Sequence, residues 1–155
     1  MTALAPSLPP RMGPGVSLPP AAKLWTVAEF HRLGELGLFE GRQAQLIDGT
    51  ILEEGPMNPP HATAVELAGE VFRGLFGKGR RIRSQLPILL GQTTDPQPDF
   101  AFLRGSPRDA VEHPTTAELV VEIPDPSLKF DTTDKADRYS AAGIPEYWVL
   151  DLNGR

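Results

Sequence analysis

Residues 119–135 read LVVEIPDPSLKFDTTDK, and the start of this stretch, LVVEI, has the composition of a buried β-strand. Glu122 stands inside that apolar run. A carboxylate in a protein interior is costly unless a positive group or hydrogen-bond donors replace its lost hydration. Lys135 lies at the end of the same stretch. The stretch therefore predicts an interior carboxylate with Lys135 as a candidate partner.

Composition places the chain among ordinary globular domains. It has 155 residues, 40% of them hydrophobic and 23% charged, which is typical of one soluble domain. A domain of this length buries about two-thirds of the surface that its unfolded chain exposes. The chain has no cysteine, which excludes disulfides and thiolate-bound metals and suits a reducing cytoplasm.

Hydropathy and charge argue against three further classes of protein. No apolar run approaches the ~20 residues of a membrane-spanning helix, and the N-terminus lacks the apolar core of a signal peptide. We therefore expect a cytoplasmic protein without a membrane partner. The formal net charge of -5 argues against a protein that coats nucleic acid through bulk positive charge. It is compatible with an enzyme that touches nucleic acid through one basic patch.

Local signals predict a single domain over residues 23–155, after an arm over residues 1–22 that is rich in proline and glycine and is expected to be disordered. Thr26 and Glu29 form a capping-box pattern, and Asp48 with Gly49 is a hairpin signal. The order of elements indicates an α/β (α+β) domain with a mixed sheet flanked by helices. The expected elements are a helix over 26–37, a hairpin over 43–54, a helix over 59–77, strands over 80–90, 99–103 and 118–123, a helix over 133–143 and a strand over 146–152.

Three charged residues stand in apolar or constrained settings: Asp99 after Pro98 at a strand entry, Glu122 within its strand, and Lys135 in the next helix. If the strands of Asp99 and Glu122 are neighbours, their carboxylates repel each other, and a divalent cation removes that conflict. Mg²⁺ prefers one or two carboxylates with water and substrate phosphate. Taken singly, these residues are also consistent with a turn aspartate, an edge-strand glutamate and a solvated lysine.

The segments QLIDGTI, PMNPPHATAVELAGEV and PQPDFAFLR, with residues 119–152, resemble the bacterial Uma-type restriction endonucleases of the PD-(D/E)xK nuclease superfamily. The resemblance covers about residues 24–155. It implies a restriction-endonuclease-like fold and an Mg²⁺- or Mn²⁺-dependent endonuclease acting on nucleic acid, with DNA as the expected substrate. Asp99 and Glu122 correspond to the metal-binding acids. The usual position of the lysine holds Pro124, and Lys135 on the following helix takes its place among the catalytic residues.

The sequence departs from the family pattern in three places. Gln45 stands where the family usually has glutamate, so it keeps hydrogen-bonding groups and loses the charge. The loop after the strand adds Asp125. Family members commonly continue past the last strand, so a C-terminal portion is expected to be missing here. These departures leave a second interpretation open: a catalytically inactive member of the fold that binds or regulates.

Further residues are candidates for substrate binding. Gln45 and His61 are expected to line the site, and Arg81 and Arg83 belong to the basic cluster KGRRIRS, which suits contacts with a phosphate backbone. The cluster is equally consistent with a solvated turn and one strand face. A homodimer is also expected, with the segment IPEYWVLDL, residues 144–152, as a candidate interface.

Overall fold

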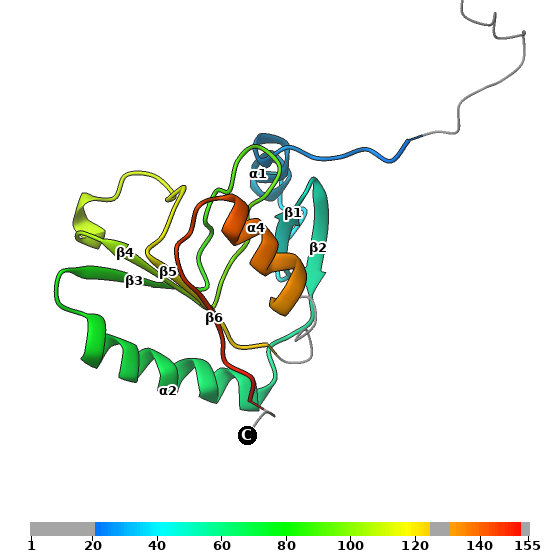
Figure 1. Ribbon diagram of the computed structural model, residues 1–155. Coiled ribbons are helices and arrows are strands. Elements are labelled where there is room, and N and C mark those ends of the chain that lie inside the picture. The colour runs from blue at the N-terminus through cyan, green and yellow to red at the C-terminus, as the bar shows by residue number, and fades with distance from the viewer. Residues whose placement is uncertain (1–20, 125–130, 153–155) are drawn as a thin grey trace, which may run out of the picture.

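The structure, a computed structural model, describes residues 21–124 and 131–152. The predicted arm falls outside this part of the chain apart from residues 21–22, and so does Asp125. The elements follow the order that the sequence predicts (Figure 1). They are α1 (Val27–Glu35), β1 (Gln43–Ile47), β2 (Thr50–Glu54), α2 (Pro59–Phe76), β3 (Arg80–Ser84), β4 (Phe100–Arg104), the short helix η1 (Pro107–Asp109), β5 (Leu119–Glu122), the π-helical turn η2 (Asp131–Lys135), α4 (Ala136–Ala141) and β6 (Tyr147–Val149).

The central sheet is mixed, as predicted. Its strand order is β3-β4-β5-β6, with antiparallel pairing up to β5 and a parallel pairing of β5 with β6. The parallel pair needs a crossover, and η2 with α4 forms it. The hairpin β1-β2 makes a separate two-stranded sheet. The molecule is therefore a single α+β domain in which η2 and α4 are tied to the end of β5.

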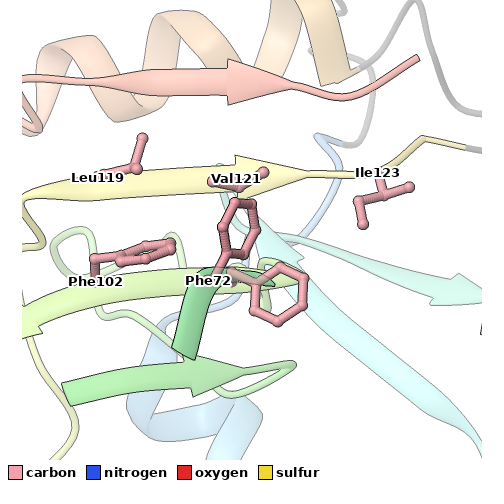
Figure 2. Packing of buried hydrophobic residues seen from close by; sticks show 6 residues of the cluster. Phe72, Phe102, Leu119, Val121 and Ile123 are labelled. Atoms are coloured by element: carbon pink, nitrogen blue, oxygen red, sulfur yellow. The ribbon is translucent and has the colours of Figure 1, made fainter. Parts of the chain in front are cut away.

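Helices cover both faces of the central sheet (Figure 1). On one face, Phe72 of α2 packs edge-on against Phe100 and Phe102 of β4, and Figure 2 shows this cluster with Leu119, Val121 and Ile123. On the other face, Tyr139 of α4 packs with Ala101 and Val120. Alternation along each strand separates the two cores. Odd-numbered residues of β4 and even-numbered residues of β5 therefore point toward α4.

Capping residues fix where two helices begin. Thr26 and Glu29 form the predicted capping box at α1. The Asn58 side chain accepts the His61 N–H and starts α2 before Pro59. Asn58 therefore sets the direction of the first turn of α2, which carries His61. Within residues 21–124 and 131–152, each helix is too short or too polar to cross a bilayer.

Two predicted strands are shorter than expected: the strand predicted over residues 146–152 is limited to β6, Tyr147–Val149, and β3 is shortened at its end. The sequence predicts strand over residues 80–90, whereas β3 ends at Ser84. Gln85 has a φ of 52°, in the left-handed region that a non-glycine residue rarely adopts. Its N–H points to the Pro98 and Asp99 carbonyl oxygens. The chain therefore leaves the sheet at Gln85, which lies next to Asp99, the residue before β4.

Candidate active site

Strand register brings Asp99 and Glu122 together. Phe100 pairs with Val121 across β4 and β5, and one step further along this antiparallel ladder places Asp99 opposite Glu122. Both project toward the α4 face, because Ala101 and Val120, two residues away on each strand, belong to the core on that face. Asp99 is 7% exposed and Glu122 4%. Two carboxylates thus lie side by side in a largely buried setting.

Backbone amides hold both carboxylates in place. The Ile123 N–H donates to Asp99 Oδ2 at 2.8 Å, and the Asp99 N–H donates to Glu122 Oε2 at 3.4 Å. Each strand therefore binds the acid of its neighbour. Such charge-assisted bonds restrict the rotamers of a carboxylate. The two acids are positioned by the sheet itself and not by mobile loops.

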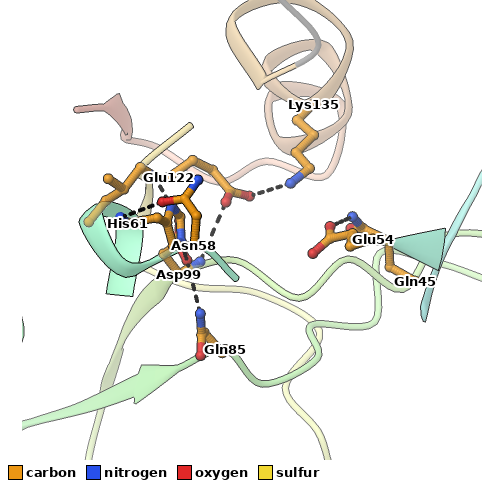
Figure 3. Close-up of polar contacts among 9 residues, drawn as sticks. Gln45, Glu54, Asn58, His61, Gln85, Asp99, Glu122 and Lys135 are labelled. Carbon is orange, nitrogen blue, oxygen red and sulfur yellow. Dashed lines mark hydrogen bonds and ion pairs between the residues drawn. The ribbon is translucent and has the colours of Figure 1, made fainter. Parts of the chain in front are cut away.

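Lys135 supplies the positive charge that the buried Glu122 carboxylate needs. It closes η2, is 6% exposed, and its Nζ lies 3.1 Å from Glu122 Oε1 (Figure 3). The Tyr139 hydroxyl donates to the same oxygen at 3.0 Å. A buried ion pair is tolerated only when further hydrogen bonds complete it. Lys135 and Tyr139 supply that compensation from one helical segment, four residues apart.

Two side chains reach the other acid. His61 Nε2, from the first turn of α2, lies 3.3 Å from Asp99 Oδ1, and since a carboxylate only accepts, this nitrogen carries the proton. Gln85 Nε2 donates to the same oxygen at 3.4 Å. Sequence reasoning identified His61 and missed Gln85. A glutamine after a basic strand carries no turn signal, and only its unusual backbone conformation reveals that it faces the site.

These residues line a cavity of about 330 Å³. Its wall also includes Glu54 at the end of β2, which the sequence did not single out. Gln45 lies on β1 beside the cavity: it is buried, and its side-chain amide donates to Glu54 (Figure 3). Gln45 therefore reaches the site through Glu54. The lining residues are Gln43, Glu54, Gly55, Pro56, Met57, Asn58, His61, Gln85, Gln97, Asp99, Glu122, Ile123 and Lys135.

The donor set fits a hard divalent cation with few protein ligands. In the part of the chain that the structure describes, no three histidine, aspartate or glutamate side chains are grouped closely enough to hold a metal. Mg²⁺ does not need such a cage, because it keeps several waters and takes one or two carboxylates. Both bonds to Asp99 Oδ1 are longer than the usual 2.9–3.0 Å. That oxygen is weakly engaged and can accept a further ligand.

Arg81 and Arg83 lie apart from this cavity. They stand on β3 and line a second hollow near the end of α2. The structure thus brings together Asp99, Glu122, Lys135 and His61, sets Gln45 just behind them, and places the two arginines elsewhere. Asp125 belongs to the residues outside the described ranges.

Known proteins share this architecture. The chain is similar to a solved structure from Anabaena variabilis, a putative nuclease belonging to DUF820, with a TM-score of 0.62 and 14% identity over 81% of this chain and 73% of that one. This likeness shows that the two share a fold. The model of the Uma2 family, described as "Putative restriction endonuclease", matches residues 27–155. The chain therefore belongs to the Uma2 family, as its sequence indicates. No curated protein matches it.

Proposed function

We propose that this protein is a metal-dependent endonuclease that hydrolyses phosphodiester bonds of nucleic acid, with DNA as the substrate. The observation that carries the proposal is the buried pair Asp99 and Glu122, held by backbone amides and completed by Lys135, at the wall of a cavity. Membership of the Uma2 family supports it.

In this proposal Asp99 and Glu122 hold Mg²⁺ or Mn²⁺. When bound, the ion supplies Lewis-acid polarisation of the phosphate and lowers the pKa of a coordinated water. The protein's own contribution is to hold the two acids rigidly at neighbouring strand positions. Because their amide partners belong to the sheet, little reorganisation is needed when the substrate arrives.

Lys135 and His61 complete the chemistry. Hydrolysis forms a bond from water oxygen to phosphorus, breaks the phosphorus–oxygen bond to the leaving sugar, and moves one proton from the water to that alkoxide. The Lys135 ammonium, held at Glu122 by its ion pair, donates to the attacking water or to the phosphate oxygens as negative charge develops. His61 donates from Nε2 to Asp99 and orients that carboxylate from the α2 side.

Cleavage of closed circular plasmid with and without Mg²⁺ tests the proposal. The wild type is expected to nick or linearise the plasmid only with metal, and Asp99→Ala and Lys135→Ala are each expected to lose about 10²-fold or more of the rate. Glu35→Ala, an exposed change on α1, a helix that contributes no residue to the cavity of the carboxylates, is the matched control. Equal weak cleavage by the wild type and the two site variants means contamination, and the proposal then fails.

A second candidate is a catalytically inactive protein that uses the same fold to bind or regulate. The observation that favours it is Gln45, an uncharged side chain at a position where the family resemblance implies glutamate; its amide donates to Glu54. This candidate predicts that, with any metal at any concentration, the wild type cleaves plasmid no faster than the Asp99 and Lys135 variants. The assay above therefore separates the two.

A further inference from the structure

Arg81 and Arg83 share the face of the sheet that carries the two acids. Arg83 pairs with Ala101 across β3 and β4, and Arg81 pairs with Leu103. Ala101 and Leu103 pack into the core on the α4 side, and directly opposite residues of an antiparallel pair project to one face. Both arginines therefore project to the same side as Asp99, which precedes β4 on that face.

The arginines line an open groove of about 760 Å³, which we call the arginine groove. It lies between the end of α2, the edge strand β3 and the segment 107–113. Its lining residues are Arg73, Gly77, Arg80, Arg81, Ile82, Arg83, Ser84, Leu86, Pro107, Ala110, Val111, Glu112 and His113. Four arginines and one histidine face a single acid, Glu112, so the groove is strongly basic in a chain whose net charge is negative.

Most of this positive charge is not neutralised within the described residues. Arg80 pairs with Glu118 at 2.9 Å, whereas Arg81 takes part in no hydrogen bond or ion pair there. Arg83 donates to the Pro87 carbonyl at 3.1 Å and to His113 Nδ1 at 3.2 Å, and not to a carboxylate of the described residues. The Nε atoms of both Arg81 and Arg83 are buried and have no hydrogen-bond partner among those residues.

Like charges crowd together in the groove. Burial, and next the nearby Arg81 charge, lower the pKa of Arg83. Guanidinium groups that repel each other and keep unused buried donors are costly in the free protein. An anion with several oxygens relieves both costs at once, because arginine binds phosphate through two parallel N–H donors.

The groove and the acid pair meet at Gln85. Ser84 and Leu86 line the arginine groove, and Gln85 between them lines the cavity of the carboxylates. A strand rises about 3.3 Å per residue, so Arg83 lies about 7 Å and Arg81 about 13 Å before Gln85 along β3. Successive nucleotides of one duplex strand are about 3.4 Å apart along the helix axis. The groove is therefore about two to four nucleotides from the acids.

We propose that the arginine groove binds the phosphates of the nucleic-acid strand two to four nucleotides to one side of the bond that Asp99 and Glu122 address. This inference rests on the proposed function. It specifies the substrate as a polynucleotide that extends past the cleaved bond, and it makes Arg81 and Arg83 substrate-binding residues and not catalytic ones.

Binding without cleavage tests the groove. Fluorescence anisotropy with labelled 20-nucleotide duplex DNA, single-stranded DNA and RNA, in EDTA at several salt concentrations, compares the wild type with Arg81→Ala and Arg83→Ala. Each substitution is expected to weaken binding to at least one of the three and to reduce the salt slope by about 0.7 to 0.9. Arg32→Ala, which removes the same charge from an exposed position on α1, is expected to change neither.

Arg81→Gln and Arg83→Gln, which keep a long polar side chain, guard against a folding defect, and circular dichroism checks each variant. Unchanged affinity and salt slope in the folded Arg81 and Arg83 variants overturn the proposal. A second result also overturns the proposal: inorganic phosphate protects the wild type but not the variants against thermal unfolding, while polynucleotide binding is the same in all of them. The groove would then bind small anions only.

The outcome is separable from that of the proposed function. If the wild type cleaves plasmid and the arginine variants bind polynucleotide as the wild type does, the groove assignment fails and the nuclease stands. If the wild type never cleaves but binding depends on Arg81 and Arg83, the nuclease proposal fails and the groove stands as a nucleic-acid binding site.

Discussion

Glu122 is the central residue of the site, because a buried carboxylate needs a positive charge and hydrogen-bond donors around it. It accepts from Lys135, from Tyr139 and from the Asp99 amide. These donors come from the residue before β4, from η2 and from α4, so the carboxylate links the central sheet to the crossover. The same arrangement that stabilises the acid also delivers the ammonium to the cavity. Structure and proposed chemistry are therefore coupled at a single side chain.

Removing one partner of this pair is expected to cost more than removing both. Lys135→Met leaves Glu122 buried without its cation and should lower the free energy of unfolding by about 3–5 kcal/mol. Glu122→Gln combined with Lys135→Met removes both charges and should recover most of that loss. Urea unfolding of the wild type, both single variants and the double variant measures the coupling. Strictly additive losses would show that the two groups do not interact in the folded protein.

At the scale of elements, capping geometry and strand alternation do most of the positioning. The sequence predicts the start of α1, the hairpin and the strands that carry Asp99 and Glu122, because capping boxes, an Asp-Gly turn and apolar runs are local signals. It also indicates that the two acids lie side by side if their strands are neighbours, and the sheet order meets that condition. It does not predict the end of β3, since a left-handed glutamine has no local signature and depends on the carbonyl groups of Pro98 and Asp99.

Long-range geometry explains the other differences. Glu54 faces the cavity because of how the β1-β2 hairpin docks against the sheet, which no local pattern encodes. The basic cluster predicts contacts of Arg81 and Arg83 with a phosphate backbone but not their position, and β3 places them along the strand in a groove separate from the acids. The burial of Gln45 and its hydrogen bond to Glu54 likewise depend on how the hairpin folds, so the local sequence does not predict them.

Glu29 gives α1 a pH-dependent stability. Hydrogen bonds from Lys23 and then from the Thr26 amide lower the pKa of Glu29 from 4.5 to about 2. A lowered pKa means that the folded state favours the ionised form. The stabilisation is therefore present above the ordinary pKa of 4.5 and is lost as the pH falls through about 2.

Urea midpoints at about pH 5 and about pH 2.5 are expected to differ less in Glu29→Gln than in the wild type, because the variant has no proton to bind at this position. Glu35→Gln, a matched change in the last turn of α1, serves as the control. A wild-type pH dependence that Glu29→Gln reproduces in full would contradict the role of the capping box.

At the scale of the whole molecule, the sheet ends on an exposed apolar edge. Trp148 of the edge strand β6 is 40% exposed, and Leu150, just after the strand, is 36% exposed. This supports our expectation of a homodimer through residues 144–152, since large apolar side chains on an edge strand favour pairing with another chain. Light scattering is expected to give twice the monomer mass for the wild type and the monomer mass for Trp148→Glu. A wild type that stays monomeric at about 100 μM would contradict this expectation.

Metal binding by the acid pair is the central claim. Calorimetric titration of the whole protein with Mn²⁺ is predicted to show saturable binding in the wild type. Asp99→Asn and Glu122→Gln are each predicted to weaken it by more than about tenfold, since losing a ligand costs at least as much as losing an outer-shell partner. Asp109→Asn should bind as the wild type does. Equal Mn²⁺ affinity in the wild type and both acid variants would contradict the account.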